Sequence, residues 1–195
     1  MTPQPAPTNH HPASVRAEDL VEGMELTVEQ FLDLPDTDDR HELVNGRLTI
    51  MPPPEFPHAQ VQFNIGGALH YWIRTIGRGR GLGEVACHLA EGLVRAPDLC
   101  WVEHLPEGGS PRKLEGAPDL VIEIRSPRDS WKAMTDKAAE YLTHGGRLVW
   151  LIDPERRLVE VHRNDASPLT LTESDALQGG DVLPGFSIGV AEIFI

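Results

Sequence analysis

The sequence has few cysteines, no long apolar run and no recognisable secretory signal. Only two of its 195 residues are cysteine, Cys87 and Cys100, and they lack the Cys-x-x-Cys spacing of a zinc site. No apolar run approaches the roughly 20 residues that cross a bilayer. The first residues lack the charged and apolar segments of a secretory signal. We therefore expect a cytoplasmic protein without membrane contact, whose cysteines are buried thiols rather than a disulfide.

Positive charge is also scarce, since the formal net charge is −13. This balance opposes broad adhesion to phosphate backbones, so any binding of nucleic acid has to use a local basic surface. The run Arg74, Arg78 and Arg80 and the pair Arg112 and Lys113 could supply one. A solvated loop surface explains the same residues at least as well.

Length and composition favour one domain with an aliphatic core. Apolar residues make up 40% of the 195 residues, whereas aromatic residues make up only 6%. Residues 1–17 contain four prolines among polar residues, which is typical of a disordered tail. The remaining residues, 18–195, are expected to form the single domain.

Local patterns predict the helices and strands of this domain. A capping box at Thr27 starts a short helix, and Asn45-Gly46 predicts a hairpin over residues 41–50. Periodicity and turn residues further predict helices over 58–75 and 130–143, the second capped by Asp129, and strands over 84–90, 93–102, 119–125, 148–152, 158–163 and 169–172. The core order is thus helix, three strands, helix, strand, with extra strands at both ends.

Three segments are expected to lie outside the regular core. The glycine-rich residues 77–83 indicate a flexible turn, because the full fingerprint of a nucleotide-binding loop is missing. Residues 103–117 indicate an exposed connection, and residues 181–195 are expected to pack along the sheet edge. Exposed strands at both ends of the chain favour a homodimer.

Two acidic residues lie inside short apolar segments that are typical of buried strands. Asp98 lies within residues 94–102 and Glu123 within residues 118–126. An ionised carboxylate there is costly unless a cation or a donor compensates it. If the polar faces of the two strands coincide, Asp98 and Glu123 can share one divalent ion. Oxygen ligands of this kind suit Mg²⁺ or Mn²⁺ better than Zn²⁺.

A lysine on the helix over residues 130–143 is the preferred third member of this site. Lys137 lies at the border of the apolar stripe of that helix, so its stem can follow the core while its ammonium reaches the sheet. Arg125, on the same strand face as Glu123, is the competing candidate. Asp119 follows a proline at a strand start, where an acid often caps a turn. The ordinary interpretation of Glu42 and His58 is that they are hydrogen-bonding structural residues.

Four short sequence motifs are more informative together than separately. They are Ala96-Pro-Asp98, Pro118-Asp-Leu-Val-Ile-Glu123-Ile-Arg-Ser-Pro127, Asp136-Lys137-Ala-Ala-Glu-Tyr141 and Leu148-Val-Trp-Leu-Ile-Asp-Pro154. With Glu42-Leu-Val-Asn-Gly-Arg-Leu48 and Asp181-Val-Leu-Pro-Gly-Phe186, they resemble a large bacterial family of restriction-endonuclease-like proteins in the PD-(D/E)XK nuclease superfamily. The resemblance covers roughly residues 24–195, and the combination is far more specific than any one segment.

The resemblance implies an α/β (α+β) fold with a restriction-endonuclease-like core, a mixed central sheet flanked by helices, and metal-dependent hydrolysis of DNA. Asp98 and Glu123 match the two acids of the superfamily motif, which with the Ile124 carbonyl would hold Mg²⁺ or Mn²⁺. Arg125 stands where the motif has lysine, and an arginine stays protonated and cannot act as a general base. Lys137 would then supply the amine from the helix.

Two other functions remain open on the sequence alone. Because a fold does not fix an activity, the chain could be a non-catalytic interaction module on a nuclease scaffold, which its acidic balance and Arg125 favour. It could also be a structural protein whose acids only pair with nearby arginines, such as Glu123 with Arg125.

Overall fold

The computed structural model describes residues 15–104 and 113–195, so most of the tail predicted over residues 1–17 lies outside the described part. The helical elements are η1 (Ala17–Asp19), α1 (Val28–Leu32), α2 (Phe56–Ile76), α3 (Trp131–Thr143) and α4 (Val190–Ile193). The strands are β1 (Arg40–Val44), β2 (Arg47–Met51), β3 (Arg80–Leu82), β4 (Cys87–Ala90), β5 (Leu93–Arg95), β6 (Leu99–Val102), β7 (Leu114–Glu115), β8 (Leu120–Ile124), β9 (Leu148–Asp153), β10 (Leu158–Arg163), β11 (Ala166–Leu171), β12 (Ala176–Gln178) and β13 (Ser187–Gly189).

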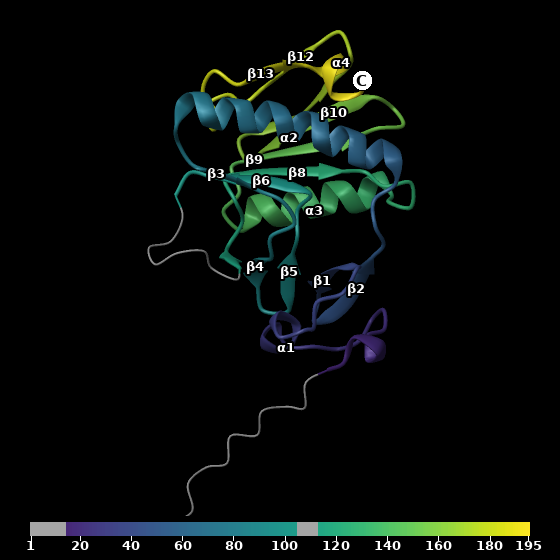
Figure 1. Ribbon diagram of the computed structural model, residues 1–195. Helices are drawn as coiled ribbons and strands as arrows, with labels where there is room; N and C mark the ends of the chain where they lie inside the picture. Colours follow the sequence, from purple (N-terminus) through teal and green to yellow (C-terminus); the bar gives the residue numbers. More distant parts are fainter. Residues whose placement is uncertain (1–14, 105–112) are drawn as a thin grey trace, which may run out of the picture.

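A mixed six-stranded sheet in the order β11-β10-β9-β8-β6-β3 forms the centre of the molecule. Helix α2 lies on one face of this sheet and α3 on the other (Figure 1). A five-stranded sheet in the order β2-β1-β5-β4-β7 lies on the α3 side. Helices on both faces of a mixed sheet, with extra strands before and after, confirm the fold class expected from the sequence.

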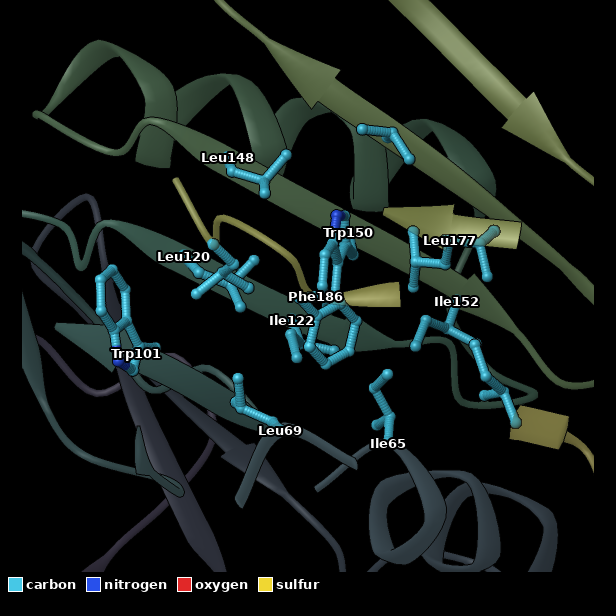
Figure 2. Close-up of a cluster of buried hydrophobic side chains, with 14 of the residues drawn as sticks. Ile65, Leu69, Trp101, Leu120, Ile122, Leu148, Trp150, Ile152, Leu177 and Phe186 are labelled. Carbon is cyan, nitrogen blue, oxygen red and sulfur yellow. The ribbon is translucent and has the colours of Figure 1, made fainter. Parts of the chain in front are cut away.

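Helix α2 covers its face of the sheet because its apolar residues recur at helical spacing. Val61, Ile65, Leu69 and Trp72 are all buried, and the helix ends at Gly77, which adopts a positive φ of 68°. Ile65 and Leu69 point toward aliphatic and aromatic side chains of the large sheet (Figure 2). Within residues 15–104 and 113–195, no helix is long and apolar enough to cross a membrane.

The opposite face of the sheet packs against α3 and the smaller sheet. Met134, Ala138 and Tyr141 of α3 are buried in this second core, as the apolar stripe predicted. Cys87 and Cys100 lie in the same core as free thiols, which confirms the expectation for the two cysteines. Burial, together with the nearby charge of Glu123, raises the pKa of Cys100 to about 12, so this thiol is unreactive at neutral pH.

The strand predicted over residues 93–102 is wrong as a single element. The chain leaves the smaller sheet after β5 and enters the large sheet at β6, with residues 96–98 between them. Pro97 lacks the amide hydrogen that a continuous ladder needs at this point. The break places Asp98 at the junction between the two sheets, which the sequence pattern did not indicate.

The glycine-rich segment predicted as a flexible turn contains a strand. β3 pairs antiparallel with β6 and forms an edge of the large sheet. A Cβ atom on Gly81 would lie only 2.9 Å from Ile73 of α2, so glycine allows the strand to approach the helix. β3 is therefore an ordered strand that lies beside α2.

Two smaller predictions also need correction. Ser130 rather than Asp129 caps α3, because its hydroxyl accepts a hydrogen bond from the Ala133 amide, whereas Asp129 accepts one from the Ser126 amide. The final segment does not follow the sheet edge. Phe186 is buried against the α2 side of the large sheet (Figure 2), and Leu183 belongs to the same core. β13 pairs with β12 in a separate two-stranded sheet.

Two glycines give a matched test of this packing. Gly79 has a φ of +74°, and a Cβ there would meet Trp101 and lie 2.6 Å from the Val102 carbonyl oxygen. We expect Gly79→Ala to lower the free energy of unfolding by about 2 kcal/mol or more. Gly67 lies in α2 with nothing within 4 Å of the added Cβ, so Gly67→Ala should raise it by about 0.5–1 kcal/mol. Urea denaturation measures both, and equal effects of the two substitutions would contradict the packing.

Candidate active site

Strand register brings Asp98 and Glu123 together. β6 and β8 run antiparallel with Leu99 opposite Ile122, so extending the register by one residue sets Asp98 opposite Glu123. Residues directly opposite on antiparallel strands share a face, with Cβ atoms about 4.5–5.5 Å apart. Both side chains are buried, with 1% of Asp98 and 3% of Glu123 exposed. The two acids therefore face each other inside the protein.

Asp98 is held by partners from three other elements. Its Oδ1 accepts a hydrogen bond of 2.6 Å from Arg40 at the start of β1, and its Oδ2 accepts one of 2.7 Å from the Ile124 amide. His58 Nε2, in the first turn of α2, lies 3.2 Å from Oδ2. Burial alone raises the pKa of Asp98, but the hydrogen bond and charge of His58, with the charges of Arg40 and Lys137, lower it to about 2. Asp98 is thus ionised at neutral pH.

Glu123 lies in a more negative environment. Lys137 Nζ lies 2.9 Å from its carboxylate, and the Tyr141 hydroxyl donates a hydrogen bond of 2.8 Å to its Oε1. Burial raises the pKa of Glu123, the charge of Lys137 lowers it, and the charges of Asp98 and Glu42 raise it, to about 7 overall. The site therefore favours an additional positive charge, either a proton on Glu123 or a bound cation.

Lys137 joins Glu123 to a third buried acid. Its Nζ also lies 2.8 Å from Glu42 Oε1, in the middle of β1. Glu42 in turn accepts hydrogen bonds of 2.8 Å from Arg95 and 3.0 Å from the Ala96 amide. Burial lowers the pKa of Lys137, but the charges of Glu123 and Glu42 raise it overall, so the side chain stays an ammonium. Likewise the charges of Lys137 and Arg95 outweigh burial and lower the pKa of Glu42.

The structure does not bring Arg125 or Asp119 to this cluster. Arg125 donates hydrogen bonds to the Asp129 carbonyl, to Asp153 and to Glu155, and it forms none with Glu123. Asp119 accepts a hydrogen bond of 2.8 Å from the Glu103 amide at a strand start. The alternative in which Glu123 pairs with Arg125 is therefore wrong, because Glu123 pairs with Lys137.

Four further residues belong to the cluster. Glu42 and His58 form hydrogen bonds, as the sequence interpretation expects of them, and their partners include Arg95 and Asp98. No role is assigned to Arg40 or Arg95 from the sequence. Signals for two of these four residues were present. His58 continues the buried stripe of α2 at helical spacing, where a polar side chain needs a partner. Arg95 lies between apolar residues of a strand, where a guanidinium needs a carboxylate.

The donor chemistry of the cluster fits a hard divalent cation. Asp98 and Glu123 offer carboxylate oxygens on one face, and the raised pKa of Glu123 reflects negative charge that a cation would relieve. In the described part of the chain, no three His, Cys, Asp or Glu side chains form a ready metal centre. Backbone carbonyls or water would have to complete the coordination. The Ile124 amide, rather than its carbonyl, is the group in contact with Asp98.

The fold and the cluster define a class of protein. The large mixed sheet lies between two helices, and two acids face each other on its adjacent strands. A lysine of α3 contacts one of these acids. These features are expected of a restriction-endonuclease-like protein. The model of the Uma2 family, described as "Putative restriction endonuclease", matches residues 28–191, so the chain belongs to this family. This confirms the resemblance found in the sequence.

A solved structure has the same fold. It is described as a putative nuclease belonging to DUF820 from Anabaena variabilis ATCC 29413, and it is 23% identical to this chain. The TM-score is 0.78, and the match covers 87% of this chain and 97% of that one. A search of curated proteins gave no match. Family and fold together support a nuclease.

The raised pKa of Glu123 predicts a pH-dependent effect of Glu123→Gln on stability. A carboxyl group whose pKa rises from 4.5 to about 7 on folding contributes stability that is present below pH 4.5 and lost as the pH rises through 7. The amide of the variant stays neutral at every pH, so the variant would not lose this stability as the pH rises. Its oxygen could still accept the Tyr141 hydrogen bond. Without divalent ions, we expect the variant to be more stable than the wild type by roughly 2–3 kcal/mol at pH 8 and by far less at pH 5. Urea denaturation in EDTA tests this, and an equal difference at both pH values would contradict it.

Proposed function

We propose that this protein is a metal-dependent endonuclease that hydrolyses phosphodiester bonds of DNA. The observation that carries the proposal is the pairing of Asp98 with Glu123 across adjacent strands, with the Lys137 ammonium 2.9 Å from Glu123. Phosphodiester hydrolysis needs acids that hold a cation and a positive group near the phosphate, and this cluster offers both.

Asp98 and Glu123 would hold Mg²⁺ or Mn²⁺, with the Ile124 carbonyl as a further ligand. When bound, such an ion polarises the phosphate and lowers the pKa of a bound water. An ionised carboxylate has about four acceptor positions. Asp98 has contacts with Arg40, His58 and the Ile124 amide, so acceptor capacity remains for a cation.

Lys137 would act through its charge rather than as a base. Its raised pKa keeps it protonated, so it can stabilise the negative charge that develops on the phosphate or orient the attacking water. Glu42 fixes the Lys137 ammonium beside Glu123, and Arg95 fixes Glu42. Glu42 and Arg95 are thus positioning residues in this proposal.

Substitution of either acid tests the proposal directly. We expect the wild type to nick supercoiled plasmid DNA in Mg²⁺ or Mn²⁺, and Asp98→Asn and Glu123→Gln to lower the rate by at least about 100-fold. Arg125→Gln is the control, because Arg125 contacts Asp153 and Glu155 instead of the two acids, and it should retain the activity. Equal residual cleavage by wild type and acid variants would show that the activity comes from a contaminant.

The helix offers a matched pair of lysines. Lys137→Met removes the ammonium near Glu123 and should lower the nicking rate by about 100-fold. Lys132→Met removes an exposed lysine of the same helix whose partner is Asp136, so nicking should be unchanged. Circular dichroism checks that both variants are folded. Similar activity of the two variants would exclude a role for Lys137 in the reaction.

A non-catalytic interaction module is the second candidate function. It is favoured by one observation: Arg40 and Lys137 already compensate Asp98 and Glu123 with ion pairs of 2.6 and 2.9 Å. Titration calorimetry with Mn²⁺ separates the two functions. The endonuclease should bind Mn²⁺ below millimolar concentration and lose this binding in Glu123→Gln. The module should show no binding in either protein.

A further inference from the structure

A groove runs between α2 and the edge strand β3. Its volume is about 670 Å³, and its walls include Phe63, Gly67 and Arg74 on the helix side and Arg80, Gly81 and Leu99 on the sheet side. Pockets that hold ligands typically measure roughly 300–1,000 Å³. The groove is therefore large enough for a ligand but small for a nucleic-acid duplex.

The groove carries positive charge in a protein of net charge −13. Arg74 and Arg80 both line it, and in the part of the chain that the structure describes neither forms an ion pair with an acid. Arg78, between them in sequence, pairs with Glu103 and is thus neutralised. Lys113, from the other basic segment, pairs with Glu115. The Arg80 side chain donates a hydrogen bond to the Gly79 carbonyl. Two guanidinium groups without an acidic partner on one groove suit the phosphates of a polymer.

An aromatic side chain lies in the same groove. Phe63 is 79% exposed although it belongs to a helix whose other face is fully packed. A single exposed apolar residue is common on protein surfaces. An exposed aromatic ring beside free arginines is, however, the arrangement with which proteins bind unpaired bases, since the bases stack on the ring.

Glycines keep the groove open. Gly67 lies in the middle of α2, where glycine costs about 1 kcal/mol relative to alanine. A Cβ on Gly67 would have nothing within 4 Å, so close packing does not require glycine there. Gly66 differs, because its Cβ would lie 3.3 Å from Leu99. The open space at Gly67 leaves room for a ligand to pass over the helix.

One end of the groove lies beside the candidate active site. Gln62, which lines the groove, donates a hydrogen bond of 3.0 Å to the Asp98 carbonyl. A Cβ on Gly83, another lining residue, would lie 3.5 Å from the same carbonyl. A chain bound in the groove would therefore reach the strand that carries Asp98.

We propose that this groove binds single-stranded DNA. Phosphates would contact Arg74 and Arg80, a base would stack on Phe63, and the strand would continue toward Asp98. The cleavage of that strand rests on the endonuclease function proposed above, whereas binding in the groove does not. The substrate of the site is accordingly an unpaired or locally opened DNA strand.

Fluorescence anisotropy of a labelled 12-nucleotide DNA strand in EDTA tests the binding without cleavage. We expect Arg74→Gln with Arg80→Gln to weaken binding at least about 10-fold and to reduce the slope of log affinity against log salt by about 1.4, since each phosphate contact on a single strand contributes about 0.7. Phe63→Ala should weaken binding about 5-fold or more. Arg47→Gln, at the start of β2 in the smaller sheet, removes a charge outside the groove and should change binding less than 2-fold.

Gly67 provides a second, sterically matched pair. Gly67→Gln and Gly67→Glu place side chains of similar size in open space, so both variants should fold. Both should weaken binding by filling the groove, and Gly67→Glu should weaken it further by repelling phosphates. Equal binding of wild type and both variants would overturn the proposal.

The outcomes separate the two proposals. Tighter binding of a DNA duplex or of an RNA strand than of single-stranded DNA would overturn the groove assignment, as would no binding by the wild type. Normal binding by the groove variants, together with nicking that depends on Asp98, would overturn the groove and leave the endonuclease intact. Loss of binding by the groove variants in a protein that cleaves no DNA would support the groove and overturn the endonuclease.

Discussion

One buried ammonium connects the parts of this protein. Lys137 of α3 contacts Glu123 of the large sheet and Glu42 of the smaller sheet, at 2.9 and 2.8 Å. Removing this ammonium would leave two buried carboxylates without their shared partner, and breaking a buried ion pair in this way typically costs about 3–5 kcal/mol. Lys137 therefore links the two sheets by ion pairs in addition to the apolar packing between them. The same contact holds a positive charge beside the two facing acids.

Asp98 depends on a second constraint, the crossing of the chain from one sheet to the other. Because Pro97 interrupts the ladder, Asp98 lies at the junction, where Arg40 from β1, His58 from α2 and the Ile124 amide from β8 all reach it. These partners keep the carboxylate ionised despite burial. Glu123, one strand away, is compensated less fully, and its pKa rises to about 7. Two neighbouring acids thus differ in protonation because their environments differ, a pattern typical of functional sites.

A negative net charge does not prevent a protein from binding nucleic acid if one part of its surface is positively charged. Most basic residues near the site are neutralised by acids, as Arg95 is by Glu42 and Glu140. The two arginines of the α2–β3 groove are not. A protein with net negative charge repels phosphate polymers in general, so it binds them where a groove supplies uncompensated positive charge. Such a protein would hold DNA weakly outside the groove.

The sequence alone determined helices α1, α2 and α3, the Asn45-Gly46 hairpin, the burial of the two acids and the position of Lys137 at the border of its helix. These features depend on neighbours a few residues apart, which periodicity and turn chemistry report. Only the tertiary structure decided that Lys137 rather than Arg125 meets Glu123, that Glu42 joins them, and that residues 93–102 divide between two sheets. Those outcomes depend on strand register and on contacts between separate helices and strands. Lys137 and Glu123 are 14 positions apart in the chain, and Glu42 and Arg95 are 53 apart, so the periodicity of one element does not show which partner each side chain meets.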